Sequence, residues 1–426
     1  MRIFGRFVAD RSGNFGLITA VLAVPLIGAA GLSVDFSHAL SVRSQLQAAA
    51  DAAAVGAIAQ SSDAAATAMT MTGNGPIPIA KTDAHNIFFS QMSGETGNLP
   101  VELTIDVTKT SNTLNSTVSF SAAVSTSFMQ ILGQTSMKIS GTATAQYQTA
   151  SFMDFYMLLD NTPSMGVGAT ADDVSKLQAK TGCAFACHQM DQASNNYTAA
   201  KSLGVNMRID VVRKATQALT DTAKNERVTA DQFRMGVYTF GTKAEDAKLT
   251  TISSLNSNLT QVKTYTDAVD LMTIPYQNYN SDQLTSFDSA LTQMNTIIEP
   301  AGSGNSNTDR QKILFFVSDG VADAYKPSSC TKKTTGGRCQ EPIDTSFCKP
   351  LKDRGVKIAI LYTTYLPLPS NDWYNKWISP FQNEIPTRMS DCASPGLYFE
   401  VSPTEGISAA MKALFLKTIS SPRITS

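Results

Sequence analysis

The chain has 426 residues and a formal net charge of −1, and its composition is 42% hydrophobic and only 16% charged. This length exceeds that of one compact domain, and the recurring periodic apolar stretches exclude a disordered chain. No dense basic block is present, so the composition argues against a nucleic-acid partner.

The first predicted element is an uncharged apolar stretch. Residues 15–34 (FGLITAVLAVPLIGAAGLSV) would span about 30 Å as a helix, which is the thickness of a hydrocarbon core. Arg2, Arg6 and Arg11 precede the stretch and the next basic residue is Arg43, which predicts a cytoplasmic segment 1–14, a single transmembrane helix at 15–34 and a remainder outside the cytoplasm. A cleaved signal sequence is the alternative, although its apolar region usually runs about 7–15 residues.

Helical spacing continues beyond the apolar stretch, because Ala39, Val42 and Leu46 recur at intervals of three and four residues. One long helix is therefore expected to leave the membrane. Residues 10–57 begin with D-R-S-G-N, close the apolar stretch on G-L-S-V-D and end with L-Q-A-A-A-D-A-A-A shortly before Gly56. In these three features the segment resembles the TadE/TadG-like proteins of Flp (tight-adherence) pilus assembly. The resemblance implies a role in that assembly, an anchor in a bacterial inner membrane and a periplasmic remainder.

The middle part, residues 35–150, changes from a helical period to a period of two. Residues 61–79 are rich in Ala, Ser, Thr, Gly and Pro and are interpreted as a linker. Alternating apolar residues then predict three or so antiparallel strands near 101–107, 118–124 and 137–139. A helix followed by such a sheet is typical of pilin-like proteins, and a spacer sheet that lifts the next domain off the membrane is the alternative.

The last part, residues 151–426, alternates apolar strands with helices, which predicts a doubly wound α/β sheet. The predicted strands are 152–160, 233–240, 312–319, 356–364 and 397–402, and the predicted helices include 207–225, 285–298 and 405–419. In such a fold, ligand sites form at the carboxyl ends of the strands, where the loops converge.

Two of these predicted strands end in aspartate. The first ends at Asp160, with Thr162 and Ser164 just behind it, and the second ends at Asp319, while Thr285 begins a predicted helix. Magnesium prefers a near-octahedral shell of oxygen ligands, usually one or two carboxylates with hydroxyls and waters. The five residues therefore predict a site for Mg²⁺, or for Mn²⁺ or Ca²⁺. A decayed site held together by hydrogen bonds alone is the alternative.

The same five residues resemble the metal-ion-dependent adhesion site of von Willebrand factor A domains. The first loop of that site usually reads D-x-S-x-S, so Thr162 replaces a serine but keeps its hydroxyl. The strand K-I-L-F-F-V-S-D-G at 312–320 and the helix R-I-D-V-V-R-K-A at Arg208 match the family as well. The resemblance implies a Rossmann-like domain over 151–426, whose metal ion binds a carboxylate of a partner.

All six cysteines lie in the last part, which favours disulfide bonds and an oxidising compartment. Proximity in the sequence pairs Cys183 with Cys187, Cys330 with Cys339, and Cys348 with Cys392. The run C-A-F-A-C-H at the first pair is close to the C-x-x-C-H motif that attaches haem, but three residues separate its cysteines. A local disulfide is the preferred interpretation, and haem binding is the alternative.

The sequence shows no Ser-His-Asp arrangement, phosphate loop or zinc signature, and the five candidate ligands include no base to activate water. It therefore predicts an anchored periplasmic binding protein rather than an enzyme. Its expected partners are the inner membrane and proteins of pilus assembly or other envelope proteins. A surface adhesin or envelope sensor unrelated to pili is the alternative function, and a metallohydrolase or haem protein is a third.

Overall fold

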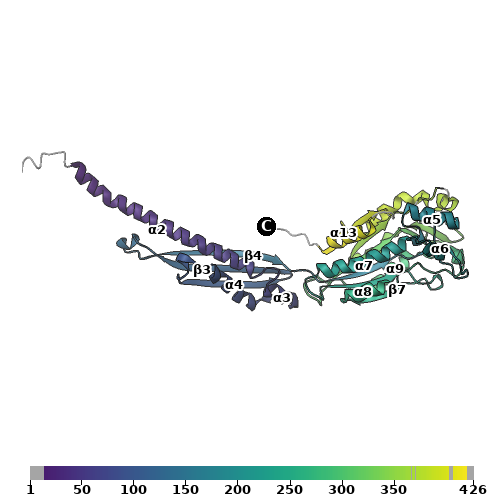
Figure 1. Cartoon of the computed structure of the whole chain (residues 1–426), viewed down its shortest axis with the longest axis horizontal. Helices are drawn as coiled ribbons and strands as arrows, with labels where there is room; N and C mark the ends of the chain where they lie inside the picture. The colour runs from purple at the N-terminus through teal and green to yellow at the C-terminus, as the bar shows by residue number, and fades with distance from the viewer. Residues whose placement is uncertain (1–13, 366, 370, 403–405, 420–426) are drawn as a thin grey trace, which may run out of the picture. The chain divides into compact units, whose positions relative to one another are not determined.

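The structure is a computed structural model that describes residues 14–365, 367–369, 371–402 and 406–419. The chain divides into two compact units, Met1–Thr149 and Ala150–Ser426 (Figure 1). The predicted cytoplasmic charges Arg2, Arg6 and Arg11 lie outside the described residues.

The first unit is a long helix packed on an antiparallel sheet of order β1-β2-β3-β4. Its helices are α2 Asn14–Gly56, α3 Asp63–Thr70, α4 Pro78–Gln91, η2 Gly94–Thr96 and η3 Met129–Leu132, and its strands are β1 Gly75–Pro76, β2 Val101–Thr110, β3 Thr113–Ser125 and β4 Ser136–Gln148. In Figure 1, α2 lies along β3 and β4. Alternate side chains of β3, including Val118 and Phe120, share a buried cluster with the alanine-rich face of α2 that begins at Ala39. The long helix and the alternating strands are thus present.

The predicted linker at 61–79 is wrong, because α3 occupies much of it. Ser62 caps this helix by accepting a hydrogen bond from the amide of Ala65 (3.1 Å). Ala65 and Ala68 are buried in a small apolar cluster with Ile77. The alanines that suggested a linker instead form a close-packed helix face, which is consistent with alanine being the strongest helix former.

The second unit is built on a six-stranded sheet of order β13-β12-β8-β5-β6-β7. Its strands are β5 Met153–Leu159, β6 Phe233–Thr239, β7 Thr250–Asn256, β8 Gln311–Ser318, β12 Lys357–Thr363 and β13 Tyr398–Val401. All neighbours pair in parallel except β7, which is an antiparallel edge. The parallel strands are the five predicted ones. The sequence of β7, TTISSLN, is mostly polar and was not predicted as a strand.

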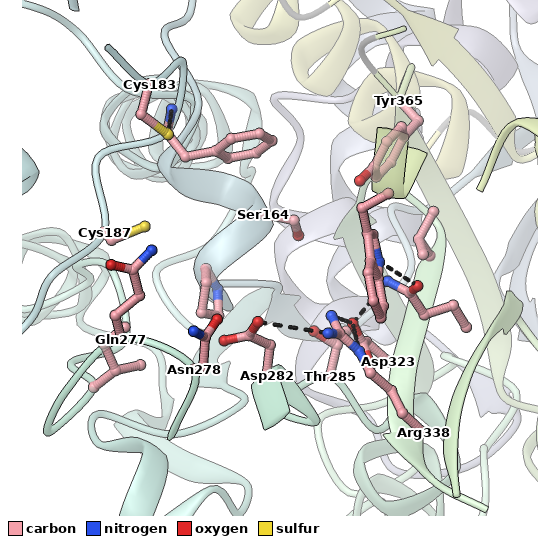
Figure 2. A pocket seen from close by; sticks show the side chains of 16 residues that line it. Ser164, Cys183, Cys187, Gln277, Asn278, Asp282, Thr285, Asp323, Arg338 and Tyr365 are labelled. Carbon is pink, nitrogen blue, oxygen red and sulfur yellow. Dashed lines mark hydrogen bonds and ion pairs between the residues drawn. The ribbon is translucent and has the colours of Figure 1, made fainter. Parts of the chain in front are cut away.

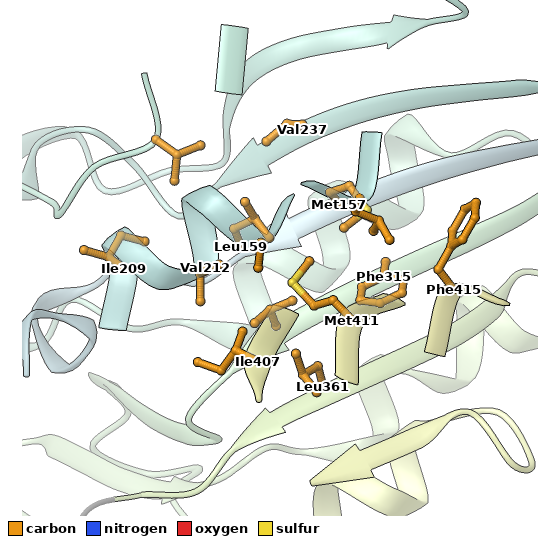
Figure 3. Packing of buried hydrophobic residues seen from close by; sticks show 14 of the residues in the cluster. Met157, Leu159, Ile209, Val212, Val237, Phe315, Leu361, Ile407, Met411 and Phe415 are labelled. Carbon is orange, nitrogen blue, oxygen red and sulfur yellow. The ribbon is translucent and has the colours of Figure 1, made fainter. Parts of the chain in front are cut away.

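Helices cover both faces of this sheet, so the unit is a doubly wound α/β fold. One face is covered by α7 Arg208–Glu226, α8 Leu259–Thr266 and α13 Ile407–Ile419, and the other by α9 Phe287–Ile297, α10 Lys349–Asp353 and α12 Ile385–Cys392. Residues of β5 alternate between the two cores: Phe155 and Met157 belong to the first, and Tyr156 and Leu158 to the second. Figure 3 shows the first core, where strand side chains meet those of α7 and α13.

The strand order reverses between β5 and β8. From β5 the chain adds β6 and β7 on one side, and it later places β8, β12 and β13 on the other. A crevice forms at such a reversal, outside the carboxyl ends of the strands. The other elements are a small sheet of order β10-β11-β9 and short helices, namely β9 Val321–Tyr325, β10 Thr334–Thr335, β11 Arg338–Pro342, α5 Ala171–Thr181, α6 Asn196–Ser202, α11 Asp372–Trp377, η4 Pro163–Gly166, η5 Ala244–Asp246, η6 Tyr279–Asp282, η7 Thr345–Phe347 and η8 Ser379–Glu384.

Candidate metal centre

Asp160 and Asp319 lie at this strand reversal. Asp160 directly follows β5 and Asp319 directly follows β8, and the amide of Asp160 donates to the carbonyl of Val317 (3.0 Å). Both side chains are fully buried. The parallel pairing of β5 with β8 therefore brings together two carboxylates that are distant in the sequence.

Three hydrogen bonds hold the carboxylate of Asp160. Thr162 donates to Oδ1 through its amide (3.0 Å) and its hydroxyl (2.7 Å), and the hydroxyl of Ser318 donates to Oδ2 (2.7 Å). The hydroxyl of Thr162 also lies 3.5 Å from that of Ser164. The threonine at 162 therefore places its hydroxyl beside both Asp160 and Ser164.

Ser164 and Thr285 line a cleft of about 250 Å³ next to this buried group (Figure 2). The other three predicted ligands are fully buried and do not line it. Thr285 precedes α9, and its backbone exchanges two 2.8 Å hydrogen bonds with that of Asp323. The structure thus brings four of the predicted ligands together and places Thr285 on the same cleft as Ser164.

Burial of the two like charges disfavours their ionisation. Burial, together with the negative charge of Asp319, raises the pKa of Asp160 to about 6, although Ser318 and Thr162 oppose this shift. Burial also raises the pKa of Asp319, and Arg208 opposes that shift. A divalent cation bound here would replace the repulsion between the carboxylates with attraction.

Arg208 belongs to this site. Its side chain is 1% exposed, its Nη1 lies 3.2 Å from Oδ2 of Asp319, and its Nη2 donates to the carbonyl of Thr364 (3.4 Å). Its Nε has no hydrogen-bond partner among the described residues. The helix motif drew attention to Arg208, but no local pattern indicates that its side chain reaches an aspartate 111 residues further on.

Asn161 was also missed, because it occupies the variable position of the D-x-T-x-S loop. Its side chain is buried, donates to the carbonyls of Gly241 (2.7 Å) and Asp270 (3.0 Å), and accepts from the amide of Phe240 (3.0 Å). These bonds tie the first ligand loop to the segment that follows β6 and to the segment that follows α8, directly beside Thr162.

The donor set fits a small, hard cation. The five predicted ligands offer carboxylate and hydroxyl oxygens, without thiolate or imidazole, and such oxygens suit Mg²⁺, Mn²⁺ or Ca²⁺ better than softer metals. With both aspartates ionised and Arg208 protonated, the buried group carries a net charge of −1.

The expected disulfide between Cys183 and Cys187 is absent, and both thiols are free. The amide of Phe185 donates to Sγ of Cys183 (3.4 Å), and the amide of Ala186 donates to the carbonyl of Gly166 (2.9 Å). The backbone between the two cysteines therefore pairs with the end of η4, where Phe185 also forms an isolated bridge with Val167. Both thiols line the cleft (Figure 2).

The other two expected disulfides, Cys330–Cys339 and Cys348–Cys392, are present. A carboxylate oxygen of Glu341 and the sulfurs of Cys330 and Cys339 all lie within 4.8 Å of one another, close enough to be considered as ligands of one metal ion. The two sulfurs are bonded to each other, however, and Glu341 is paired with Lys326 (2.7 Å). We therefore interpret these three residues as stabilising the hairpin of β10 and β11, which the disulfide crosslinks.

On the side of the cleft away from Cys183 and Cys187, several side chains form a network around Arg338 (Figure 2). Arg338 donates to Asp323 (2.9 Å) and lies 3.5 Å from Asp282, and its guanidinium lies 4.5 Å from the ring centre of Trp373. The indole of Trp373 donates to Gln340 (2.8 Å). Aromatic and charged side chains therefore line this side of the cleft, and the guanidinium of Arg338 is held between two carboxylates and an indole ring.

Residues 13–68 match the Tad family, described as putative Flp pilus-assembly TadE/G-like. This segment contains the whole of α2 and most of α3. Comparison with curated proteins finds no match for the sequence.

Several solved structures are similar at low identity. Proximal thread matrix protein 1 from the mussel byssus is 14% identical, with 63% of this chain and 46% of that chain covered and a TM-score of 0.35. The von Willebrand factor domain of the type V pili tip protein Mfa5 from Porphyromonas gingivalis is 9% identical, with coverages of 65% and 99% and a TM-score of 0.37. The PilB minor pilin from Streptococcus sanguinis is 10% identical, with coverages of 75% and 77% and a TM-score of 0.33. The fold is accordingly assigned from the strand order and helix placement above.

Proposed function

We propose that this chain is a membrane-anchored protein of Tad pilus assembly that binds a protein partner through a divalent cation. Asp160, Thr162, Ser164, Thr285 and Asp319 would hold the cation. The observation that carries the proposal is the pair of buried aspartates at the strand reversal, next to a cleft that Ser164 and Thr285 line.

The N-terminal helix supports the anchoring. The part of α2 from Ile18 onward is long and apolar enough to cross a membrane. Its apolar side chains are exposed, with Val24 73% and Leu26 67% accessible, whereas a core helix of a soluble protein would bury them. The Tad family match covers the same segment. The proposed topology places the N-terminus in the cytoplasm and the second unit in the periplasm, where its disulfides would form.

The charge balance of the site favours a carboxylate as the partner group. A divalent cation would change the net charge of the buried group from −1 to +1, because Arg208 stays beside Asp319. A positive site at the base of a cleft attracts an acidic side chain, whose oxygen can complete the cation's coordination. The cleft of about 250 Å³ has room for one or two side chains of a partner.

The surroundings of the cleft favour binding over catalysis. Asp282 and Asp323 are the carboxylates that line it, and both are paired with Arg338. Burial raises the pKa of Asp323 to about 6 and also raises that of Asp282, although Arg338 opposes both shifts. The oxygens of both carboxylates are nevertheless engaged with the guanidinium of Arg338, so they are not free to take a proton from a bound molecule. We therefore propose that the site recognises a partner and performs no chemical step.

Thermal unfolding of the full-length protein in detergent tests the metal site. The two tryptophans, Trp373 and Trp377, both lie in the second unit, so their emission reports the unfolding of that unit alone. At a Mg²⁺ concentration of about 100 times Kd, binding to the folded state adds about 2.7 kcal/mol. This corresponds to a rise in Tm of roughly 5–10 °C for a domain of this size.

Two variants assign that rise to the proposed ligands. Asp160→Asn should abolish the Mg²⁺-dependent rise in Tm, and Thr162→Ser should retain it, because the hydroxyl survives. Equal Tm values for the wild type in Mg²⁺ and in chelator would contradict the metal site. In cells, a strain with Asp160→Asn should lose pili. Normal pili combined with lost attachment would favour an adhesin instead.

A further inference from the structure

The hairpin that joins β3 to β4 is hydrogen-bonded to α2 at the point where the apolar stretch of this helix ends. The carboxylate of Asp35 accepts hydrogen bonds from three consecutive amides of the hairpin tip, those of Ser127 (2.9 Å), Phe128 (2.9 Å) and Met129 (2.7 Å). One helical turn earlier, Phe128 packs so closely on Gly31 that a Cβ at this glycine would lie 2.7 Å from the phenylalanine. The tip is therefore held at one level along the helix.

The tip exposes large apolar side chains at that level. Ile131 is 82% accessible, Leu132 70% and Phe128 43%. Residues 126–136 contain no charged side chain. A soluble surface rarely gathers exposed apolar groups of this size without a partner for them.

The position of the tip along α2 identifies what covers it. The uncharged stretch 15–34 ends one residue before Asp35, so a membrane that holds this stretch has its surface near Gly31 and Asp35. The exposed side chains of α2, such as Val34 (55%), and those of the tip then lie at the same depth.

We propose that the tip of the β3–β4 hairpin inserts into the outer leaflet of the same membrane, with Phe128, Ile131 and Leu132 among the lipid headgroups and upper acyl chains. This inference rests on the anchoring by α2 proposed above. The chain would then hold the membrane at two points, and the first unit could not rotate freely about its anchor.

Two further features fit a lipid surface. A carboxylate at the membrane edge is costly unless it is paired, and the three amides that bind Asp35 satisfy it. Basic residues come next along both elements: Arg43 lies about 12 Å beyond Asp35 by helical rise, and it donates to the carbonyl of Ser140, two residues after Lys138. The headgroup layer extends only about 5–8 Å beyond the hydrocarbon core, so long basic side chains at this level would meet lipid phosphates by extending back towards the membrane.

Tryptophan fluorescence in reconstituted vesicles tests the inference. In the full-length chain with Trp373→Phe and Trp377→Phe, a single tryptophan is introduced at the tip (Ile131→Trp), in the apolar stretch (Val24→Trp) or on the exposed face of β4 far from the tip (Thr144→Trp). Each protein is reconstituted in phosphatidylcholine with or without brominated acyl chains, which quench only tryptophans within the bilayer.

We expect bromolipid to reduce the emission of the Val24→Trp and Ile131→Trp proteins and to leave that of Thr144→Trp unchanged. Quenching of Ile131→Trp should be strongest when the bromines lie near the headgroups, and its emission should be blue-shifted relative to Thr144→Trp. If Val24→Trp is quenched and Ile131→Trp is not, the anchor stands and the second contact is refuted. If neither is quenched, the anchor fails and the inference fails with it.

Discussion

Arg208→Met is expected to weaken the metal-free second unit while strengthening its response to Mg²⁺. Arg208 is 1% exposed, Asp319 is fully buried, and their charged atoms are 3.2 Å apart. Methionine fills similar space without the charge, so the variant leaves two carboxylates facing each other in a buried pocket. The substitution separates the arginine's role as a neutralising charge from its role as packing volume.

The magnitude follows from the burial of the pair. Removing one partner of a buried ion pair costs about 3–5 kcal/mol, because the other charge stays unsatisfied. For a domain of this size the loss corresponds to a fall in Tm of roughly 6–20 °C in chelator. The cation then meets a site of net charge −2 in place of −1, without the repulsion from the guanidinium. We expect Mg²⁺ to bind at least about tenfold more tightly, which is about 1.4 kcal/mol.

Thermal unfolding followed by tryptophan emission provides the test, with Mg²⁺ titrated against wild type, Arg208→Met and the double variant that adds Asp160→Asn. The Mg²⁺-dependent rise in Tm should be larger in Arg208→Met than in wild type and absent in the double variant. A smaller rise in Arg208→Met would refute the reasoning, because it would mean that the arginine helps to form the metal site. An unchanged Tm in chelator would refute the assigned ion pair.

Three further outcomes concern stability. Although burial opposes it, hydrogen bonds from Lys201 and the backbone hold the pKa of Asp210 below its usual range. The ionised group therefore stabilises the fold above about pH 4, and this contribution is lost as pH falls through the lowered pKa. Asp210→Asn should lower Tm at pH 7, and a deficit that does not shrink as pH falls below about 4 would contradict this account. Cys348→Ser removes the disulfide that links residues 44 positions apart, and it should lower the free energy of unfolding by about 2–4 kcal/mol in denaturant. Cys183→Ser, at a free thiol, is the control and should change that free energy little. Equal losses in the two variants would show that the disulfide does not stabilise the fold. Gly141→Val places a Cβ 2.5 Å from the ring of Phe120 under α2 and should destabilise the first unit by about 1–3 kcal/mol in circular dichroism melts, with the tryptophan-monitored transition of the second unit as the internal control.

The elements that depend on local composition could be predicted from the sequence. The apolar stretch 15–34 and the five parallel strands are visible in the order of apolar residues along the chain. A helix long enough to cross a membrane and a strand buried in a sheet both need apolar side chains, whichever segments lie beside them. Asp160 and Asp319 were recognisable as candidates for the same reason, since each directly follows a strongly apolar strand.

Only the tertiary structure decided what surrounds those aspartates. The strand reversal at β5 and β8 joins their loops, and α7 carries Arg208 into the same buried space. The free thiols of Cys183 and Cys187 are likewise a feature of the tertiary structure, which their short spacing does not reveal. Contacts between segments far apart in the chain determine burial, charge pairing and the packing of the hairpin tip on Gly31. A local sequence pattern indicates which secondary structure a segment prefers, but not which distant segment will pack against it.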